Sequence, residues 1–192
     1  MAGGYRELDR TGNLLGALSL AVTDRTSDAA GGAAGQSDSA AVALSALHHF
    51  LEDPSVDLLR QVLGLTPSGT VRLVDRLQDA GYVTRRQGRD GRSVSLRLTP
   101  PGRLAAERVS AARAEVLQDA LSGLAPAERE ALDEVVSRVL VGLIRGPGAT
   151  RWMCRLCDTT ACGRGKGGCP VANAARERYA QVARMRRPTE RQ

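Results

Sequence analysis

The stretch from Asp53 to Thr99 constrains the fold more than any other part of the chain. Asp53-Pro54 and Thr66-Pro67 each read as a helix N-cap followed by a first-turn proline, and Gly64 stands where the first helix would end. The second helix carries a buried stripe at positions i, i+3, i+4 and i+7, formed by Thr70, Leu73, Val74 and Leu77. The sequence therefore predicts two short helices joined by a tight turn.

An alternating segment follows at once and predicts a two-stranded hairpin. From Ser93 to Thr99, apolar side chains alternate with polar ones, while Tyr82 to Arg86 supplies a first strand and Gly88 to Arg92 a charged turn. Two helices alone could form an ordinary helical hairpin. The added hairpin favours a winged helix-turn-helix, whose second helix enters the major groove of DNA while arginines at the wing tip reach the minor groove.

Apolar patterns on both sides of this unit predict further helices. Long helices are expected over Leu104 to Leu121 and Pro126 to Ile144, and a short one over Asn13 to Val22. The stripe of the 126–144 helix is too long for a small winged domain to bury alone, so we expect it to pair with a second copy of the chain. The Gly- and Ala-rich stretch from Thr23 to Ala40 is expected to be a loop.

The predicted fold is mainly α, with a small β-hairpin wing and long dimerisation helices. Its expected parts are an N-terminal dimerisation helix (1–22), a loop (23–40), the winged helix-turn-helix (41–103), dimerisation helices (104–146), and a four-cysteine segment with a basic C-terminal helix (147–192). In the paired histidines His48 and His49, adjacent rings point about 100° apart on a helix, so a packed or capping role is favoured over metal binding.

The charge distribution favours an anionic partner. The formal net charge is +6, and the stretch from Asp57 to Arg103 holds nine basic and four acidic residues. No apolar stretch is long enough to span a bilayer and the N-terminus is charged, so we expect a cytoplasmic protein without a membrane partner. No P-loop, dinucleotide-binding glycine pattern or open metal site with a carboxylate base is present, so an enzyme is not expected.

The order of these pieces resembles the MarR family of multiple-antibiotic-resistance-type regulators over roughly residues 14–144. The residues that carry the resemblance are Thr70 to Leu77, Gly81-Tyr82-Val83, Arg85, Asp90-Gly91-Arg92 and Leu98 to Gly102. The resemblance implies a homodimer on a pseudo-palindromic DNA operator, with a repressor as the expected mode. Members of the family commonly leave DNA in response to a small aromatic ligand or thiol oxidation, so an inducer is compatible with the resemblance, although no ligand pocket is carried over.

The resemblance also implies roles for residues of the second helix and the wing. Ser68, Val71 and Arg72 would face bases, Arg76 a phosphate, and Arg92 the minor groove, with Asp90 holding the wing in shape. Thr66 at the start of the helix and Arg89 in the wing tip complete the expected DNA-binding set.

All four cysteines of the chain lie within sixteen residues, in the pattern Cys154-x2-Cys157-x4-Cys162-x6-Cys169. In a reducing compartment such a cluster favours one metal centre per chain over a disulfide framework. Four thiolates suit zinc, which we favour, whereas the Cys-x2-Cys pair and the final Cys-Pro also fit the iron–sulfur tails of MerR-type redox sensors. Metal-free redox thiols are the third alternative.

Two other functions remain open at this point. The cysteine centre could control DNA affinity as an iron–sulfur or thiol-based redox sensor, or the winged fold could act as an interaction adaptor without DNA. Neutral residues at positions 72, 76 and 92 would favour the adaptor, but all three positions hold arginine. The operator, the regulated genes and the inducer do not follow from the sequence.

Overall fold

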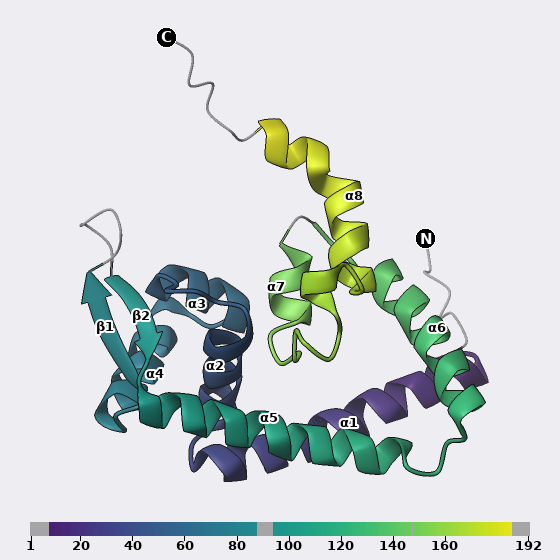
Figure 1. Cartoon of the computed structure of the whole chain (residues 1–192), viewed down its shortest axis with the longest axis horizontal. Helices are drawn as coiled ribbons and strands as arrows, with labels where there is room; N and C mark the ends of the chain where they lie inside the picture. The colour runs from purple at the N-terminus through teal and green to yellow at the C-terminus, as the bar shows by residue number, and fades with distance from the viewer. Residues whose placement is uncertain (1–7, 88–93, 147, 186–192) are drawn as a thin grey trace, which may run out of the picture.

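A computed structural model describes residues 8–87, 94–146 and 148–185, the last five of these by their backbone alone. The helices are α1 (Arg10–Ala34), α2 (Asp38–His49), α3 (Val56–Leu63), α4 (Pro67–Asp79), α5 (Pro100–Leu121), α6 (Pro126–Gly142), α7 (Ala149–Met153) and α8 (Pro170–Met185), and the strands are β1 (Val83–Gln87) and β2 (Val94–Leu98). Figure 1 shows two long helices, α1 and α5, side by side, with the helix-turn-helix and the wing at one end of the pair. Within the described residues no helix could cross a membrane.

Helices α3 and α4 form the predicted helix-turn-helix. The Thr66 hydroxyl caps α4 by accepting a hydrogen bond from the Gly69 amide (3.1 Å), and Pro67 occupies the first turn. Gly64 ends α3 in the left-handed conformation, with φ 67°. The predicted stripe of α4 is fully buried against α2, α3 and the wing, which confirms the fold class inferred from the sequence.

The wing is the predicted antiparallel hairpin, with β1 paired to β2 in the register Val83 to Leu98. Leu96 and Leu98 point into the core. The segment before α3 adds a short third edge to this sheet, because the Leu96 amide donates to the Pro54 carbonyl (2.9 Å) and Ser55 bridges Ser95. The wing is therefore joined by hydrogen bonds to the residues that follow α2.

The predicted cap at Asp53-Pro54 is wrong. Helix α3 begins at Val56, and its N-cap is Ser55, whose hydroxyl accepts from the Leu58 amide (3.1 Å). Asp53 instead adopts a φ of 45° and forms an ion pair with Arg97 of β2. Pairing with the wing outweighs the local capping preference, and that partner is 44 residues away in the sequence.

The loop predicted over residues 23–40 is largely helical instead. Helix α1 continues to Ala34, and only residues 35–37 separate it from α2. The buried residues of its second half are Thr26, Ala30 and Ala34, which are small enough for α1 to lie closely against α5. The low intrinsic helix preference of this stretch is thus overridden by packing along α5.

A second, smaller core lies in the C-terminal part of the chain. It contains Ile144, Ala149, Cys154, Cys169, Val171, Ala172 and Ala175, with Tyr179 packed against it. The Tyr179 hydroxyl accepts a hydrogen bond from the Gly146 amide (3.0 Å), which fastens α8 to the end of α6. The cysteine segment therefore has its own packed support, separate from that of the winged unit.

Candidate nucleic-acid interface and cysteine cluster

The outer face of α4 has the composition expected of a recognition helix. Ser68, Val71, Arg72 and Arg76 are all exposed, and the Val71 side chain remains 47% accessible although it is apolar. Neither Arg72 nor Arg76 has a hydrogen bond or ion pair to any residue that the structure describes. Two unpaired guanidinium groups and an exposed methyl-bearing side chain can contact phosphates, guanine edges and thymine methyl groups.

One acidic residue on this helix is neutralised within the protein. Asp75 accepts a hydrogen bond from Arg85 Nη2 (2.5 Å), and Arg85 Nη1 also donates to Gln78 Oε1 (2.8 Å). These bonds join strand β1 to α4 and set the angle between wing and helix. The sequence marked Arg85 as one residue of the family resemblance but predicted no partner for it, because nothing local indicates one ten residues earlier.

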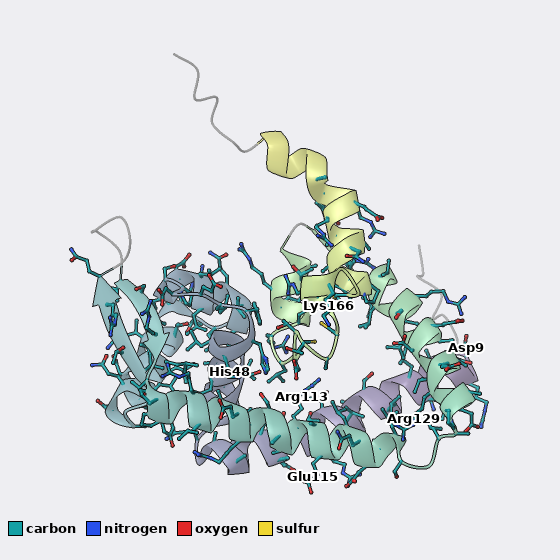
Figure 2. The ribbon with its side chains drawn as sticks, in the orientation of Figure 1. Asp9, His48, Arg113, Glu115, Arg129 and Lys166 are labelled. Carbon is teal, nitrogen blue, oxygen red and sulfur yellow. The ribbon has the colours of Figure 1, made fainter. Side chains whose placement is uncertain are left out.

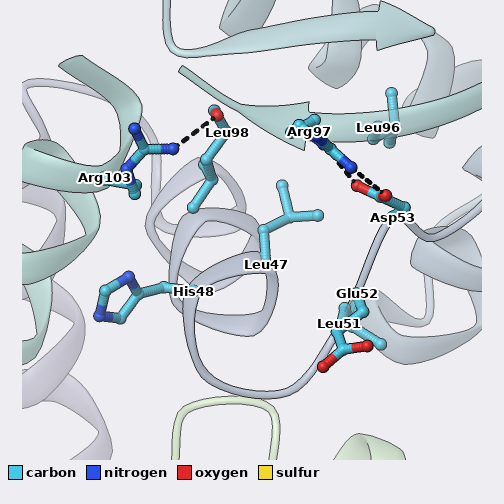
Figure 3. A pocket seen from close by; sticks show the side chains of 9 residues that line it. All are labelled: Leu47, His48, Leu51, Glu52, Asp53, Leu96, Arg97, Leu98 and Arg103. Atoms are coloured by element: carbon cyan, nitrogen blue, oxygen red, sulfur yellow. Dashed lines mark hydrogen bonds and ion pairs between the residues drawn. The ribbon is translucent and has the colours of Figure 1, made fainter. Parts of the chain in front are cut away.

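A second set of contacts fixes the base of the wing. Arg97 donates to both carboxylate oxygens of Asp53, at the rim of an open hollow of about 510 Å³ between α2 and β2 (Figure 3). Thr99 Oγ1 donates to the Gly81 carbonyl (2.6 Å) and accepts from the Gly102 amide (3.0 Å). A Cβ atom on Gly102 would stand 1.9 Å from the Tyr82 carbonyl oxygen, so only glycine fits there.

The wing tip completes the expected interface but lies outside the described residues. Arg89, Asp90 and Arg92 belong to this tip, so their proposed roles in the minor groove and in wing support stay predictions.

The four cysteines converge on the second core. Cys154 and Cys169 are buried, Cys157 and Cys162 are half-buried, and none forms a disulfide. The neighbouring Cys157 raises the pKa of Cys154, and burial together with the nearby Cys169 raises the pKa of Cys162. Among the described residues, no three His, Cys, Asp or Glu side chains are already arranged as a metal site. The structure thus brings the thiols together as two neighbouring pairs.

Two arginines provide positive charge beside the thiols. The pKa of Cys157 is lowered to about 6, first by the neighbouring Cys154 thiol and then by the guanidinium groups of Arg113 and Arg164, against the effect of burial. Arg164 Nη1 is buried with no hydrogen-bond partner among the described atoms. In Figure 2 the labelled Arg113 extends from α5 toward the cysteine loop. Thiolate charge at this place is therefore compensated from two sides.

The cysteine loop also contacts the winged unit. Thr159 Oγ1 donates to the carbonyl oxygen of His49 at the end of α2 (3.1 Å). The His49 ring lies 4.0 Å from Asp158 through Nδ1 and 2.9 Å from Ser110 Oγ through Nε2, and burial lowers the pKa of His49. The packed role predicted for His49 is confirmed. Its contacts with the cysteine loop were not predicted, because they join residues more than a hundred positions apart.

Helices α1 and α6 leave apolar side chains on the surface of the single chain. The exposed residues include Leu14, Leu15 and Leu18 on α1, Val135, Val136 and Val139 on α6, and Leu143 directly after α6. Helix α6 has no fully buried residue. The predicted stripe of α6 is in fact divided, because Leu140 packs against the second core while its neighbours face outward.

Comparison with known proteins agrees with this architecture. Residues 35–93 match the model of the MarR family, whereas no curated protein matches the chain. A MarR-family regulator from Silicibacter pomeroyi has a similar structure (TM-score 0.58, 23% identity, 74% of this chain and 98% of that one). The Staphylococcus aureus regulator MepR is also similar (TM-score 0.59, 17% identity, 68% and 96%), and a MepR variant bound to an oligodeoxyribonucleotide matches with a TM-score of 0.53 (17% identity, 71% and 99%).

The fold is that of a winged helix-turn-helix protein, and α4 stands in the place of its recognition helix. The match to the MarR family model covers residues 35–93, and the fold is the one seen in solved MarR-family regulators. The matched part ends before the cysteine loop begins.

Proposed function

We propose that this protein is a homodimeric, DNA-binding transcriptional repressor that carries a four-thiolate metal centre. The observation that carries the DNA-binding part is the exposed face of α4, where Arg72 and Arg76 are unpaired within the described residues while Asp75 is neutralised by Arg85. Binding to chromosomal DNA agrees with the cytoplasmic location expected from the sequence, and a two-fold dimer would read a pseudo-palindromic operator.

The dimer is supported by the apolar surfaces of α1 and α6. Their exposed leucine and valine side chains would be covered by the same surfaces of a second copy, as a two-fold interface requires. A small-molecule inducer is compatible with this arrangement but no pocket of the described residues identifies one.

The metal centre is supported by the convergence of all four cysteines and by nearby positive charge. Arg113 and Arg164 would offset the excess negative charge of four thiolates around a divalent ion, and the two thiol pairs would have to draw together to complete a tetrahedral shell. Zinc suits this site because it binds four cysteine thiolates in a tetrahedral shell, here within a small core. An iron–sulfur cluster that reports redox state is the alternative, and it would use the same four residues.

The DNA-binding proposal is tested on a duplex selected by the protein itself from a random-sequence library. Arg72→Ala should weaken binding by about 1 to 3 kcal/mol and relax the selected sequence, because a base contact is lost. Arg76→Ala should weaken binding to all sequences and lower the dependence of affinity on salt, because a phosphate contact is lost. Arg108→Ala on α5 removes equal charge away from α4 and is the matched control. Equal binding of all three variants in fluorescence anisotropy would refute the proposed interface.

The metal proposal is tested by elemental analysis and an absorption spectrum of anaerobically purified protein. One zinc per chain without visible colour supports the proposal, whereas iron with sulfide and a brown colour supports the alternative. Each single Cys→Ser change at the four positions should remove most of the metal, because all four share one shell. Graded, independent effects would indicate separate thiols and refute a common centre.

A further inference from the structure

The cysteine loop, residues 154–169, is fastened to the end of α2 by a polar contact. Thr159 Oγ1 donates to the His49 carbonyl oxygen (3.1 Å), an acceptor at the C-terminal end of α2. The His49 ring stands between Asp158 of the loop and Ser110 of α5, and its side chain is only 11% exposed. Asp158 is itself held in place, because its carboxylate accepts hydrogen bonds from the backbone amides of Thr160 (2.7 Å) and Ala161 (3.1 Å).

A second contact lies beside the first. The Arg164 guanidinium carbon stands 5.9 Å from the centre of the Phe50 ring, directly after α2. A guanidinium group at this distance over an aromatic ring is attracted to it. We call the contacts of Thr159 and Asp158 with His49, together with that of Arg164 with Phe50, the clasp.

The clasp residues alternate with the cysteines along the chain. Thr159 lies between Cys157 and Cys162, and Arg164 lies between Cys162 and Cys169. The Thr159 carbonyl also accepts from the Cys162 thiol (3.6 Å). An ion that orders the four sulfur atoms would therefore also order the turn that holds the clasp.

On the other side of the clasp, the chain leads directly to the wing. Asp53 follows Phe50 by only three residues and forms the ion pair with Arg97 of β2. The next residue, Pro54, accepts the hydrogen bond from the Leu96 amide. A displacement of the end of α2 is thus passed to the wing through a segment that has little slack, since three residues span at most about 10 Å.

We propose that the cysteine loop is a docked regulatory arm, in which the clasp couples occupancy of the thiolate centre to the position of the wing and hence to DNA affinity. The proposal rests on the proposed function, because it needs both a centre that can be loaded and a DNA-binding wing. The loaded centre holds the clasp closed and the wing in its DNA-binding position, whereas the empty centre loosens both. By linkage, DNA must then raise the affinity for the metal by the same factor.

The test uses the full-length protein and Zn²⁺ alone as the probe. The metal is removed with a chelator under anaerobic, reducing conditions and then restored, and affinity for the selected duplex is measured in both states. We expect the zinc-loaded protein to bind at least about fivefold more tightly. Hydrogen exchange of the amides from Phe50 to Ser55 should be slower in the loaded state, because closing the clasp protects this segment.

Two variants open the clasp without touching a cysteine or α4. Thr159→Val removes the hydroxyl donor and Phe50→Leu removes the aromatic ring, and both keep most of the side-chain volume. Each should bind stoichiometric zinc, yet the ratio of loaded to empty DNA affinity should fall toward 1, by about two- to fivefold. Thr150→Val in α7 is the matched control, because its hydroxyl has no hydrogen-bond partner among the described residues, and it should keep the wild-type ratio.

Each contrary outcome has a distinct meaning. If the wild-type protein binds zinc and DNA but zinc changes neither DNA affinity nor exchange at residues 50–55, the regulatory arm is refuted while the proposed function stands. If Thr159→Val and Phe50→Leu both keep the wild-type ratio, the clasp is not the route of coupling. If no zinc binds, the proposed zinc centre and the arm are both wrong, and DNA binding through α4 is unaffected by that result.

Discussion

Replacing Gly102 by alanine should disrupt the junction between the wing and α5. The added Cβ atom would lie 1.9 Å from the carbonyl oxygen and 2.8 Å from the carbonyl carbon of Tyr82, both of which are backbone atoms. No side-chain rotation can relieve this overlap, so the first turn of α5 has to move away from the strand. That movement would also break the bonds of Thr99 to Gly81 and Gly102.

The expected loss of stability follows from these contacts. Overpacking costs about 1 to 3 kcal/mol, and each of the two hydrogen bonds contributes about 1 kcal/mol. Gly102→Ala should therefore lower the free energy of unfolding by about 3 to 5 kcal/mol, a large share of the roughly 5 to 15 kcal/mol available to a typical domain. The substitution is small, and its effect comes entirely from the close approach of two backbones.

The assay is urea unfolding followed by circular dichroism, at one fixed protein concentration because a dimer's stability depends on it. Gly32→Ala is the matched control, since Gly32 is also helical but a Cβ there meets nothing within 4 Å. Alanine should stabilise that position by about 0.5 to 1 kcal/mol. If Gly102→Ala unfolds within 1 kcal/mol of the wild type, the reasoning from the Tyr82 contact is wrong.

Three further predictions address the dimer, the wing and the cysteine loop. Val139→Asp on the exposed side of α6 should give monomers at micromolar concentration by light scattering, and an unchanged dimer would exclude this face. Arg85→Ala should weaken DNA binding although Arg85 need not contact DNA, because the wing loses its bonds to α4; equal affinity in anisotropy would show that these bonds do not position the wing. Chelation should make the loop from Cys162 to Cys169 protease-sensitive while the winged core stays folded, and proteolysis that starts in α4 would contradict two separate cores.

The parts of the fold that were predictable are those with local chemical signals. Thr66, Pro67 and Gly64 mark the limits of α3 and α4 through capping and φ preferences that depend only on neighbouring residues. The second half of α1 lacks such signals, since its Gly, Ala, Ser and Asp residues are typical of loops. Its helical state depends on close packing against α5, which a sequence pattern cannot display.

The candidate site divides in the same way. Arg72, Val71 and the four-cysteine pattern could be named as candidates because residue type and spacing carry the chemistry. The contacts of Arg85 with Asp75 and of Thr159 with His49 could not, because each joins segments that only the folded chain brings together. Asp53 shows the limit most clearly, since its local context predicts a helix cap and its distant partner Arg97 determines its actual role.

The C-terminal segment that holds the cysteines makes contacts at both of its sides. It contacts α6 through α8, and it contacts α2 and α3 of the winged unit (Figure 1). If these contacts fix the angle between the helix-turn-helix and α5, the length over which a rotation acts is that of α5, about 33 Å for 22 residues. Rotating the helix-turn-helix by about 5° about the far end of α5 would shift the recognition helix by about 3 Å. This distance is close to the roughly 3.4 Å rise of one base pair. In the proposed two-fold dimer, such a shift would change the spacing between operator half-sites that the protein can span.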